Sequence, residues 1–335
     1  MRGSTQKALV TGGAGFIGSH LCEELLGRNF RVTALDNLST GRRENLSSLS
    51  RDQSFSFIKG DIRDEALMSK LVRSCDIVYH LAAMVGVKLI LQKPIRSIST
   101  NVTGTEILLR LASQYKKKIL ITSSSEVYGK QGCVPLRENM DSVFGPTTVP
   151  RWSYAMSKAL DEILALAYFR QKNLPVVIAR FFNTVGPRQI SRYGMVLPRF
   201  IEEALSGKPL TVYGNGSQVR SFTYVLDAVR AVADLSLCRK AEGEIFNVGS
   251  EEHVSIKQLA GMIKARTRSS SPLKFIPYAR VFGPDFEDSP CRICDLKKIK
   301  KVIGYRPCYS LDDIIRMTIA HFRGSSYRPG KRTAR

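Results

Sequence analysis

Short runs of apolar residues alternate with longer amphipathic stretches over the first half of the chain. This alternation is typical of a parallel sheet with helices on both faces, because each buried strand is followed by a crossover helix. It predicts an α/β fold built on a Rossmann-type doubly wound parallel sheet. The predicted strands are residues 7–11, 31–35, 55–59, 76–81, 118–122 and 176–181, and the predicted helices are residues 16–29, 103–115 and 154–171.

The pattern changes after about residue 183, where loops rich in Gly, Pro and Arg separate shorter elements. We expect one domain over residues 1–183 and a smaller C-terminal α/β lobe over residues 184–322, partly interleaved with the first. Residues 323–335 are basic and end the chain, which favours disorder. Within the second lobe the sequence predicts strands at 210–213, 245–248 and 274–276, and helices at 196–205, 225–237, 256–267 and 311–322.

Composition and charge narrow the class of protein. The 335 residues are 43% hydrophobic and 24% charged, as in a globular protein. No apolar run reaches the ~18 residues of a membrane helix, and no apolar signal core precedes the first strand, so we expect a cytoplasmic protein without a membrane partner. The net charge of +22 favours anionic partners such as phosphorylated metabolites. The basic runs carry no interleaved aromatic residues, which argues against a nucleic-acid surface.

The seven cysteines are odd in number and widely spaced, which predicts reduced thiols. Cys291 and Cys294 form the one close pair. No second pair of cysteines or histidines accompanies them, so the sequence predicts no metal site.

A glycine-rich turn joins the first predicted strand to the helix that follows it. Gly12, Gly15 and Gly18 permit a tight turn and let a pyrophosphate reach the backbone N–H groups at the helix N-terminus. Asp36 ends the second predicted strand, where its carboxylate can accept hydrogen bonds from ribose hydroxyls and would repel a 2′-phosphate. The unit therefore predicts a dinucleotide site that prefers NAD to NADP.

Two further segments border this predicted site. Asp61 follows the third strand, where it either contacts the adenine amino group or caps the helix that begins near Glu65. Leu81, Ala82 and Ala83 end the next strand, and their small size either lets a cofactor lie close to the backbone or serves core packing.

Tyr154 and Lys158 lie four residues apart on a predicted helix, so their side chains share one face. An ordinary tyrosine has a pKa near ~10 and is a poor base at neutral pH. A fixed ammonium group beside the phenol favours the phenolate and moves this pKa toward the working range. The pair predicts an activated base for hydride-transfer chemistry.

These segments together resemble the extended short-chain dehydrogenase/reductase family, specifically its NAD-dependent nucleotide-sugar epimerases, dehydratases and decarboxylases. The resemblance implies that NAD stays bound and is regenerated in each cycle. It further implies that Tyr154 takes the proton from the sugar 4-hydroxyl, that Lys158 holds the nicotinamide ribose, and that Ser124 hydrogen-bonds the same hydroxyl. The matching segments are residues 11–19, 36–41, 60–64, 80–83, 122–129, 154–158, 180–188, 220–227 and 246–249.

The resemblance also assigns the remaining site residues. The resemblance implies that the substrate is a nucleotide-diphosphate sugar and that it is UDP-linked. Arginine side chains suit the phosphate oxygens of such a substrate. Asn183 could equally cap a loop, and Tyr213 could equally be a core residue at a strand end. The implied cofactor residues are Gly12, Gly15, Phe16, Ile17, Gly18, Asp36, Asn37, Ser39, Gly41, Asp61, Ile62, Leu81, Ala82 and Ala83, with Tyr154 and Lys158, and the implied substrate residues are Asn183, Arg188, Val196, Tyr213 and Arg220.

The residues after Ser124 bear on the reaction. The 4,6-dehydratases carry an Asp before the Glu, and Ser125 cannot protonate a leaving hydroxyl, so dehydration is disfavoured. Ser125 and Glu126 resemble the corresponding residues of uronate decarboxylases, and Arg220 matches their arginine near the carboxylate. The sequence favours a UDP-glucuronate decarboxylase, with a UDP-hexose 4-epimerase as the alternative, in which Glu126 is a wall residue. A non-catalytic NAD- or nucleic-acid-binding protein is a third reading, disfavoured because Ser124, Tyr154 and Lys158 are all present.

The family resemblance also implies a homodimer. Such folds often pair through two long helices of each subunit in a four-helix bundle, and the helices at 103–115 and 154–171 are the candidates.

Overall fold

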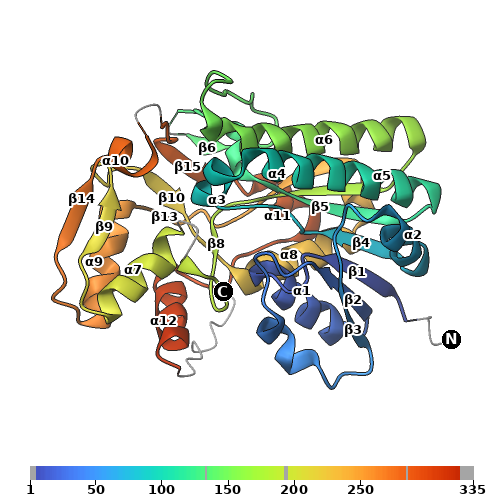
Figure 1. The fold of residues 1–335 in the computed structure, drawn as a ribbon, viewed down its shortest axis with the longest axis horizontal. Coiled ribbons are helices and arrows are strands. Elements are labelled where there is room, and N and C mark those ends of the chain that lie inside the picture. Colours follow the sequence, from blue (N-terminus) through green and yellow to red (C-terminus); the bar gives the residue numbers. More distant parts are fainter. Residues whose placement is uncertain (1–4, 133, 192–194, 284–285, 325–335) are drawn as a thin grey trace.

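The computed structural model describes residues 5–132, 134–191, 195–283 and 286–324, and a parallel sheet of seven strands lies at its centre (Figure 1). The strand order is β3-β2-β1-β4-β5-β7-β12, so the order reverses between β1 and β4. In a doubly wound sheet this switch point opens a ligand crevice at the carboxyl ends of the strands. The fold prediction is confirmed. The strands are β1 (Lys7–Thr11), β2 (Arg31–Asp36), β3 (Phe55–Lys59), β4 (Ile77–His80), β5 (Lys118–Ser124), β7 (Val176–Phe181) and β12 (Glu244–Val248).

Helices cover both faces of this sheet. In Figure 1, α5 (Gly104–Gln114) and α6 (Ser153–Lys172) lie above it, whereas α1 (Phe16–Gly27) and α8 (Val225–Leu237) lie below. Successive strand residues point to opposite faces. Leu9 of β1 accordingly packs in the same apolar cluster as Leu108 of α5. Its neighbour Val10 packs in the cluster that contains Leu21 of α1.

The element boundaries differ from the predicted ones where the backbone turns. The first helix ends at Gly27 rather than at residue 29, because Asn29 takes a left-handed conformation with φ 63°. The helix predicted at 103–115 is preceded by a π-helical turn over Ser99–Thr103. Before it come α3 (Val87–Gln92) and α4 (Pro94–Ile98), which the apolar pattern did not reveal, while α2 (Glu65–Ser74) follows β3.

The second lobe contains three small sheets. One has the order β13-β10-β15-β6, and the pairs β9/β14 and β8/β11 form the other two. These strands are β6 (Pro135–Leu136), β8 (Thr184–Val185), β9 (Leu210–Tyr213), β10 (Val219–Ser221), β11 (Thr223–Tyr224), β13 (His253–Ser255), β14 (Leu273–Ile276) and β15 (Cys291–Cys294), and the helices are α7 (Val196–Leu205), α9 (Ile256–Thr267), α10 (Tyr278–Phe282), α11 (Lys297–Ile303) and α12 (Leu311–Phe322).

The chain passes between the two lobes in both directions. β6 comes from the first half of the sequence and pairs with β15, whereas β12 comes from the second half and pairs with β7. The division at residue 183 and the disorder of 323–335 stay predictions, and most of that tail lies outside the described residues.

The cysteines correct one expectation. Cys22, Cys75, Cys238, Cys294 and Cys308 are free thiols, but Cys291 is disulfide-bonded. Disulfide formation depends on two segments of the chain approaching in space, which the spacing of cysteines along the sequence does not report. Over the described residues we find neither a helix with the length and apolar character to cross a bilayer nor a cluster of three potential metal ligands.

Candidate active site

A cleft with a cavity volume of about 470 Å³ runs along the carboxyl ends of the central strands and under the second lobe. Most of the predicted site residues line it. Gly41 and Asp61 do not appear among the described lining residues. Those that line the cleft are Gly12, Gly15, Phe16, Ile17, Gly18, Asp36, Asn37, Ser39, Ile62, Leu81, Ala82, Ala83, Ser124, Ser125, Glu126, Tyr154, Lys158, Asn183, Arg188, Val196, Tyr213 and Arg220.

The glycine turn forms a close backbone cradle between β1 and α1. Gly12 has a φ of 73°, and a Cβ placed on it would lie 2.8 Å from the backbone nitrogen of Ala82. A Cβ on Gly18 would collide with the carbonyl oxygen of Gly12. Side chains at these positions would fill the space beside the N-terminus of α1. The cradle therefore fits the pyrophosphate of a dinucleotide.

Asp36 is held rigidly at the end of β2. Its Oδ2 accepts a hydrogen bond from the Ala14 N–H at 3.0 Å, and its Oδ1 accepts one from the Leu38 N–H at 2.8 Å. Burial raises the pKa of this carboxyl. A Cβ on Gly41 would lie 2.7 Å from Asp36 Oδ2, so Gly41 gives the carboxylate room without lining the cleft. Asp36 is placed as ribose recognition requires, which fits NAD.

Asp61 lies just outside the cleft in a local hydrogen-bond network. Asn37 donates to its Oδ2 at 3.1 Å, and the Arg63 guanidinium donates to both of its oxygens, at 2.9 and 2.8 Å. The hydrogen bonds from Arg63 hold the pKa of Asp61 well below its usual range. The N-cap of α2 is Asp64, which accepts from the Leu67 N–H at 3.0 Å, so Asp61 is not the capping residue. Its contact with adenine stays a prediction.

Ser124, Tyr154 and Lys158 come together at the end of β5. Tyr154 and Lys158 lie one turn apart on α6 and are both buried, and the hydroxyl of Ser124 acts on the phenol to lower its pKa. Burial and the negative charge of Glu126 raise the pKa of Tyr154, which is the opposite of the shift expected from the neighbouring ammonium group. The ammonium of Lys158 donates to Asp161 Oδ2 at 2.9 Å, a contact that the sequence reasoning missed.

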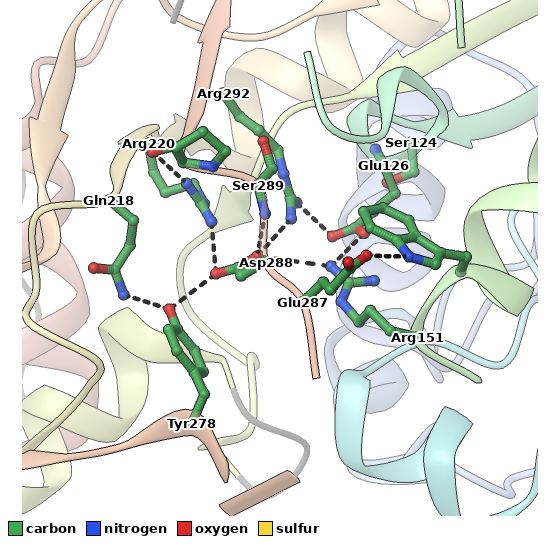
Figure 2. Close-up of polar contacts among 12 residues, drawn as sticks. Ser124, Glu126, Arg151, Gln218, Arg220, Tyr278, Glu287, Asp288, Ser289 and Arg292 are labelled. Atoms are coloured by element: carbon green, nitrogen blue, oxygen red, sulfur yellow. Dashed lines mark hydrogen bonds and ion pairs between the residues drawn. The ribbon is translucent and has the colours of Figure 1, made fainter. Parts of the chain in front are cut away.

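Glu126 lies in a network of ion pairs beside this set (Figure 2). Its Oε2 lies 2.5 Å from Arg151 Nη2, and its Oε1 forms an ion pair with Arg292 Nη1. Burial alone would raise the pKa of Glu126, but the guanidinium groups of Arg151 and Arg292 lower it to about 2. Glu126 is therefore an ionised carboxylate over the working pH range, not a proton donor.

Asp288 forms the second half of this network. It contacts Arg220 Nη2 through Oδ2 at 2.9 Å and Arg292 Nη2 through Oδ1 at 3.3 Å, and it accepts from the Tyr278 hydroxyl at 3.1 Å (Figure 2). The three guanidinium groups of Arg151, Arg220 and Arg292 face the two carboxylates of Glu126 and Asp288, which leaves one net positive charge. The cluster favours an anionic group of the substrate.

The predicted substrate residues divide into two groups. Tyr213 lies in an aromatic cluster, with the Arg199 guanidinium 4.4 Å above its ring and Phe282 in edge contact. Asn183 and Arg188, by contrast, already have protein partners. Asn183 donates to the carbonyl of Ser221 at 2.9 Å. The guanidinium of Arg188 contacts Glu23 Oε1 at 2.6 Å and Ser19 Oγ at 3.1 Å on α1.

Among the polar residues that sequence reasoning missed are Arg151, Tyr278, Asp288 and Arg292, which belong to the ion-pair network. Arg151 stands three residues before Tyr154. Its charge so close to the Tyr–Lys motif could have identified it from the sequence. The others lie in a stretch without a recognisable motif, and β15 brings Arg292 to the cleft through its pairing with β10.

A dinucleotide cradle that ends on Ser124 and the buried pair Tyr154 and Lys158 is typical of an enzyme that oxidises an alcohol with a bound nicotinamide cofactor. The model of the family described as GDP-mannose 4,6 dehydratase matches residues 9–318. The chain belongs to this family, within the extended short-chain dehydrogenases/reductases that act on nucleotide sugars with NAD.

Three relatives show what the chain is similar to. It is 44% identical to the UDP-N-acetyl-alpha-D-glucosaminuronate decarboxylase of Bacillus cytotoxicus, over 95% of this chain and 98% of that protein. It is 35% identical to UDP-glucuronic acid decarboxylase 1 of Danio rerio, over 95% of this chain and 72% of that protein. The solved UDP-glucuronic acid 4-epimerase of Bacillus cereus, in complex with UDP-glucuronic acid and NAD, superimposes with a TM-score of 0.86 at 31% identity, over 95% of this chain and 99% of that one.

Proposed function

We propose that this protein is a UDP-uronate decarboxylase, which oxidises C4 of a UDP-linked sugar acid and then releases its carboxylate as CO2. The cluster of Arg151, Arg220 and Arg292 around Glu126 carries this proposal. A neutral hexose offers no charge for a net positive cluster beside Tyr154, whereas a uronate carries a carboxylate on C5, the neighbour of the carbon that is oxidised.

The side chains divide the work by their chemistry. When bound, NAD supplies the hydride acceptor and returns the hydride within the cycle. Tyr154 takes the proton of the sugar 4-hydroxyl when its phenol is ionised, and Ser124 holds that hydroxyl in place. The resulting 4-keto acid is a β-keto acid. Its C5–C6 bond breaks, CO2 leaves, the bonding electrons form the C4 enolate, and a proton returns to C5.

The arginines serve both anionic ends of the substrate. Arg292 contacts Glu126 directly, so we assign it, rather than Arg220, to the sugar carboxylate. Arg220 forms an ion pair with Asp288 instead. We assign it to the diphosphate, whose oxygens would replace the Asp288 carboxylate as its partner. Guanidinium forks suit both kinds of oxygen.

The relatives favour two sugar acids. The relative at 44% identity is named for UDP-N-acetylglucosaminuronate, and that at 35% for UDP-glucuronate. We propose a UDP-linked substrate of this kind and rank the acetamido sugar first on the higher identity.

The alternative is a UDP-hexuronate 4-epimerase. The overlap with the UDP-glucuronic acid 4-epimerase supports it, because both reactions begin with oxidation at C4 of the same type of substrate. The two reactions differ in the fate of the 4-keto intermediate. In the decarboxylase it loses CO2, whereas in the epimerase it rotates and receives hydride on its other face.

Mass spectrometry of the products separates these functions. The purified holoenzyme is incubated separately with UDP-N-acetylglucosaminuronate, UDP-glucuronate and UDP-glucose. We expect a product lighter by one CO2 from a uronate and no reaction of UDP-glucose. An unchanged mass with a new C4 signal in the NMR spectrum would replace decarboxylation by epimerisation.

We also propose a homodimer, formed through α4 and α6. Of the two candidate helices from the sequence, the one at 154–171 is α6, whereas α4 takes the place of the one at 103–115, because the exposed apolar residues lie on α4 and α6. Ile95 and Ile163 are 84% and 64% exposed, and Ile98 and Leu160 are exposed beside them in sequence on the same two helices. In Figure 1 these helices run side by side along one face of the molecule with α5. A second copy of the chain would cover this apolar face. Light scattering should report a dimer for the wild type and a monomer for Ile163→Glu. The cytoplasmic location and the lack of a nucleic-acid partner stay predictions.

A further inference from the structure

Asp161 is a buried carboxylate that forms an ion pair with Lys158. It lies on α6, three residues after Lys158, and its Oδ2 accepts from the Lys158 ammonium at 2.9 Å. The exposed fractions of the two side chains are 1% for Asp161 and 3% for Lys158. A buried ion pair costs desolvation energy, so it is weak evidence of a purely stabilising role.

The second oxygen of Asp161 is less well satisfied. Within the described part of the chain, Asp161 Oδ1 makes no hydrogen bond that meets normal geometry. Leaving a buried carboxylate oxygen without a partner is unfavourable. Packing alone does not account for a carboxylate at this position.

The other charged groups around Asp161 are already paired or neutral. Glu162 is held by the Arg180 guanidinium at 2.9 and 2.6 Å. On β4, His80 lies between the hydroxyls of Thr11 and Thr105, and burial lowers its pKa to about 3, so it is neutral. Thr105 of α5 contributes a hydroxyl without charge. Asp161 therefore faces Lys158 as its cationic partner among the described residues.

Tyr154 experiences the charge of Asp161 as well. Besides burial, the charges of Glu126 and Asp161 raise the pKa of its phenol, and that of Arg151 lowers it. Glu126 is offset by its two arginines, whereas Asp161 acts on the same helix and through Lys158. A carboxylate that binds the ammonium opposes the stabilisation of the phenolate by that ammonium.

We propose that Asp161 is a positioning residue that holds the Lys158 ammonium and, by opposing its charge, sets the pH at which Tyr154 ionises. Tyr154 must release a proton as readily as it takes one, because the 4-keto intermediate is reduced again in the same cycle. A base that ionises too easily would be a poor acid in the return step. This part of the inference rests on the proposed function, but the effect of Asp161 on the phenol does not.

The test compares Asp161→Asn with the wild type in the NAD-loaded enzyme. The ionisation of Tyr154 is followed by ultraviolet difference titration of tyrosinate, with Tyr154→Phe in each background as the blank. We expect the Asn variant to ionise at a pH lower by roughly one unit, since a charge a few ångströms away shifts an ionisation by about that much. The acid limb of kcat/KM should move with it, and Asp161→Glu, which keeps the charge, should stay closer to the wild type.

A matched control separates this effect from loss of a buried carboxylate in general. Asp227 lies on a different helix, α8, and is also buried, and its carboxylate accepts hydrogen bonds from the backbone N–H of Cys308. Asp227→Asn should leave the tyrosinate titration unchanged. If Asp161→Asn does not fold, Asp161→Ala gives the same measurement, because it also removes the charge.

The outcomes distinguish the two proposals. An unchanged tyrosinate titration in Asp161→Asn, with lower thermal stability alone, would show that Asp161 is structural, whatever sugar the enzyme converts. A shifted titration in a protein that converts no UDP-uronate would retain the role of Asp161 and overturn the proposed function.

Discussion

The cofactor end and the sugar end of the cleft are built in different ways. The cofactor end uses one continuous stretch, in which β1, the glycine turn, α1 and β2 follow one another up to Asp36. The sugar end gathers Glu126, Arg151, Arg220, Asp288 and Arg292 from separate parts of the chain (Figure 2).

Because of this difference, we expect NAD binding and the turnover of the sugar to depend on separate sets of residues. The cofactor end depends on backbone shape, since its glycines leave room for a ligand. The sugar end depends on charge, since three guanidinium groups lie against two carboxylates in a largely buried space and leave one positive charge. Substitutions should therefore affect NAD retention at one end and turnover at the other, and the following predictions test that division.

The largest effect is expected for Tyr154→Phe. Removing the phenolic oxygen eliminates the base, and general-base catalysis contributes about 10²–10⁴-fold. We expect turnover of a UDP-uronate to fall about 10³-fold, measured by CO2 release, with NAD content unchanged. Normal turnover in this variant would contradict the assigned role of Tyr154.

Arg292→Leu should have the next largest effect. It removes one of the two ion pairs of Glu126 and a cation assigned to the sugar carboxylate. Losing a preorganised charge of this kind costs about 10²-fold in turnover. NAD content should again stay at the wild-type level. If the variant lost NAD as well, the two ends would be coupled and the division would be wrong.

Gly12→Ala should show the opposite pattern. The φ of 73° and the 2.8 Å approach of a Cβ to Ala82 make the substitution strained, at a cost of about 1–3 kcal/mol. We expect a lower melting temperature and loss of NAD during purification, measured by absorbance of the released cofactor.

Gly27→Ala is the matched control for that substitution. Gly27 lies at the end of α1, and a Cβ there would meet no atom within 4 Å. Alanine favours a helix over glycine by up to about 1 kcal/mol. The free energy of unfolding of the variant should therefore stay equal or rise slightly, and its NAD content should not change.

The smallest predicted effect concerns Glu126 and acid. Its pKa is lowered to about 2 in the folded protein from an ordinary value of 4.5, so it stabilises the fold fully above about pH 4.5 and loses this contribution as the pH falls through 2. Between pH 7 and pH 4 the loss should be roughly 1 kcal/mol. Chemical unfolding at both pH values should show this difference in the wild type and a smaller one in Glu126→Gln. Equal differences would mean that Glu126 is not held ionised by its arginines.

Local sequence was sufficient to predict most of the fold. The apolar strands are short and continuous, as expected of buried parallel strands, so β1, β3 and β7 were predicted with their observed bounds. The errors fall where side-chain patterning is weak. The left-handed Asn29 ended α1 early, and the short helices α3 and α4 carry too few residues to show a period.

The site residues that could be predicted from the sequence are those that stand in short, recognisable segments. Tyr154, Lys158 and Ser124 stand in segments with a chemical reason for their spacing, and the structure brings them together. Arg292 and Asp288 could not be found in this way, because their role depends on β15 pairing with β10. Asp161 lay within the predicted helix, but its burial against Lys158 was not apparent from its type.

The sequence by itself determined the doubly wound sheet, the glycine-rich turn and the candidate base Tyr154, since each depends on residues that are neighbours along the chain. Only the tertiary structure decided the charge balance around Glu126, the pairing of Lys158 with Asp161 and the protein contacts of Arg188. These depend on which charges become neighbours after folding and on how far burial removes them from water. Coulombic interactions between buried groups act through space, so the order of residues along the chain does not specify them.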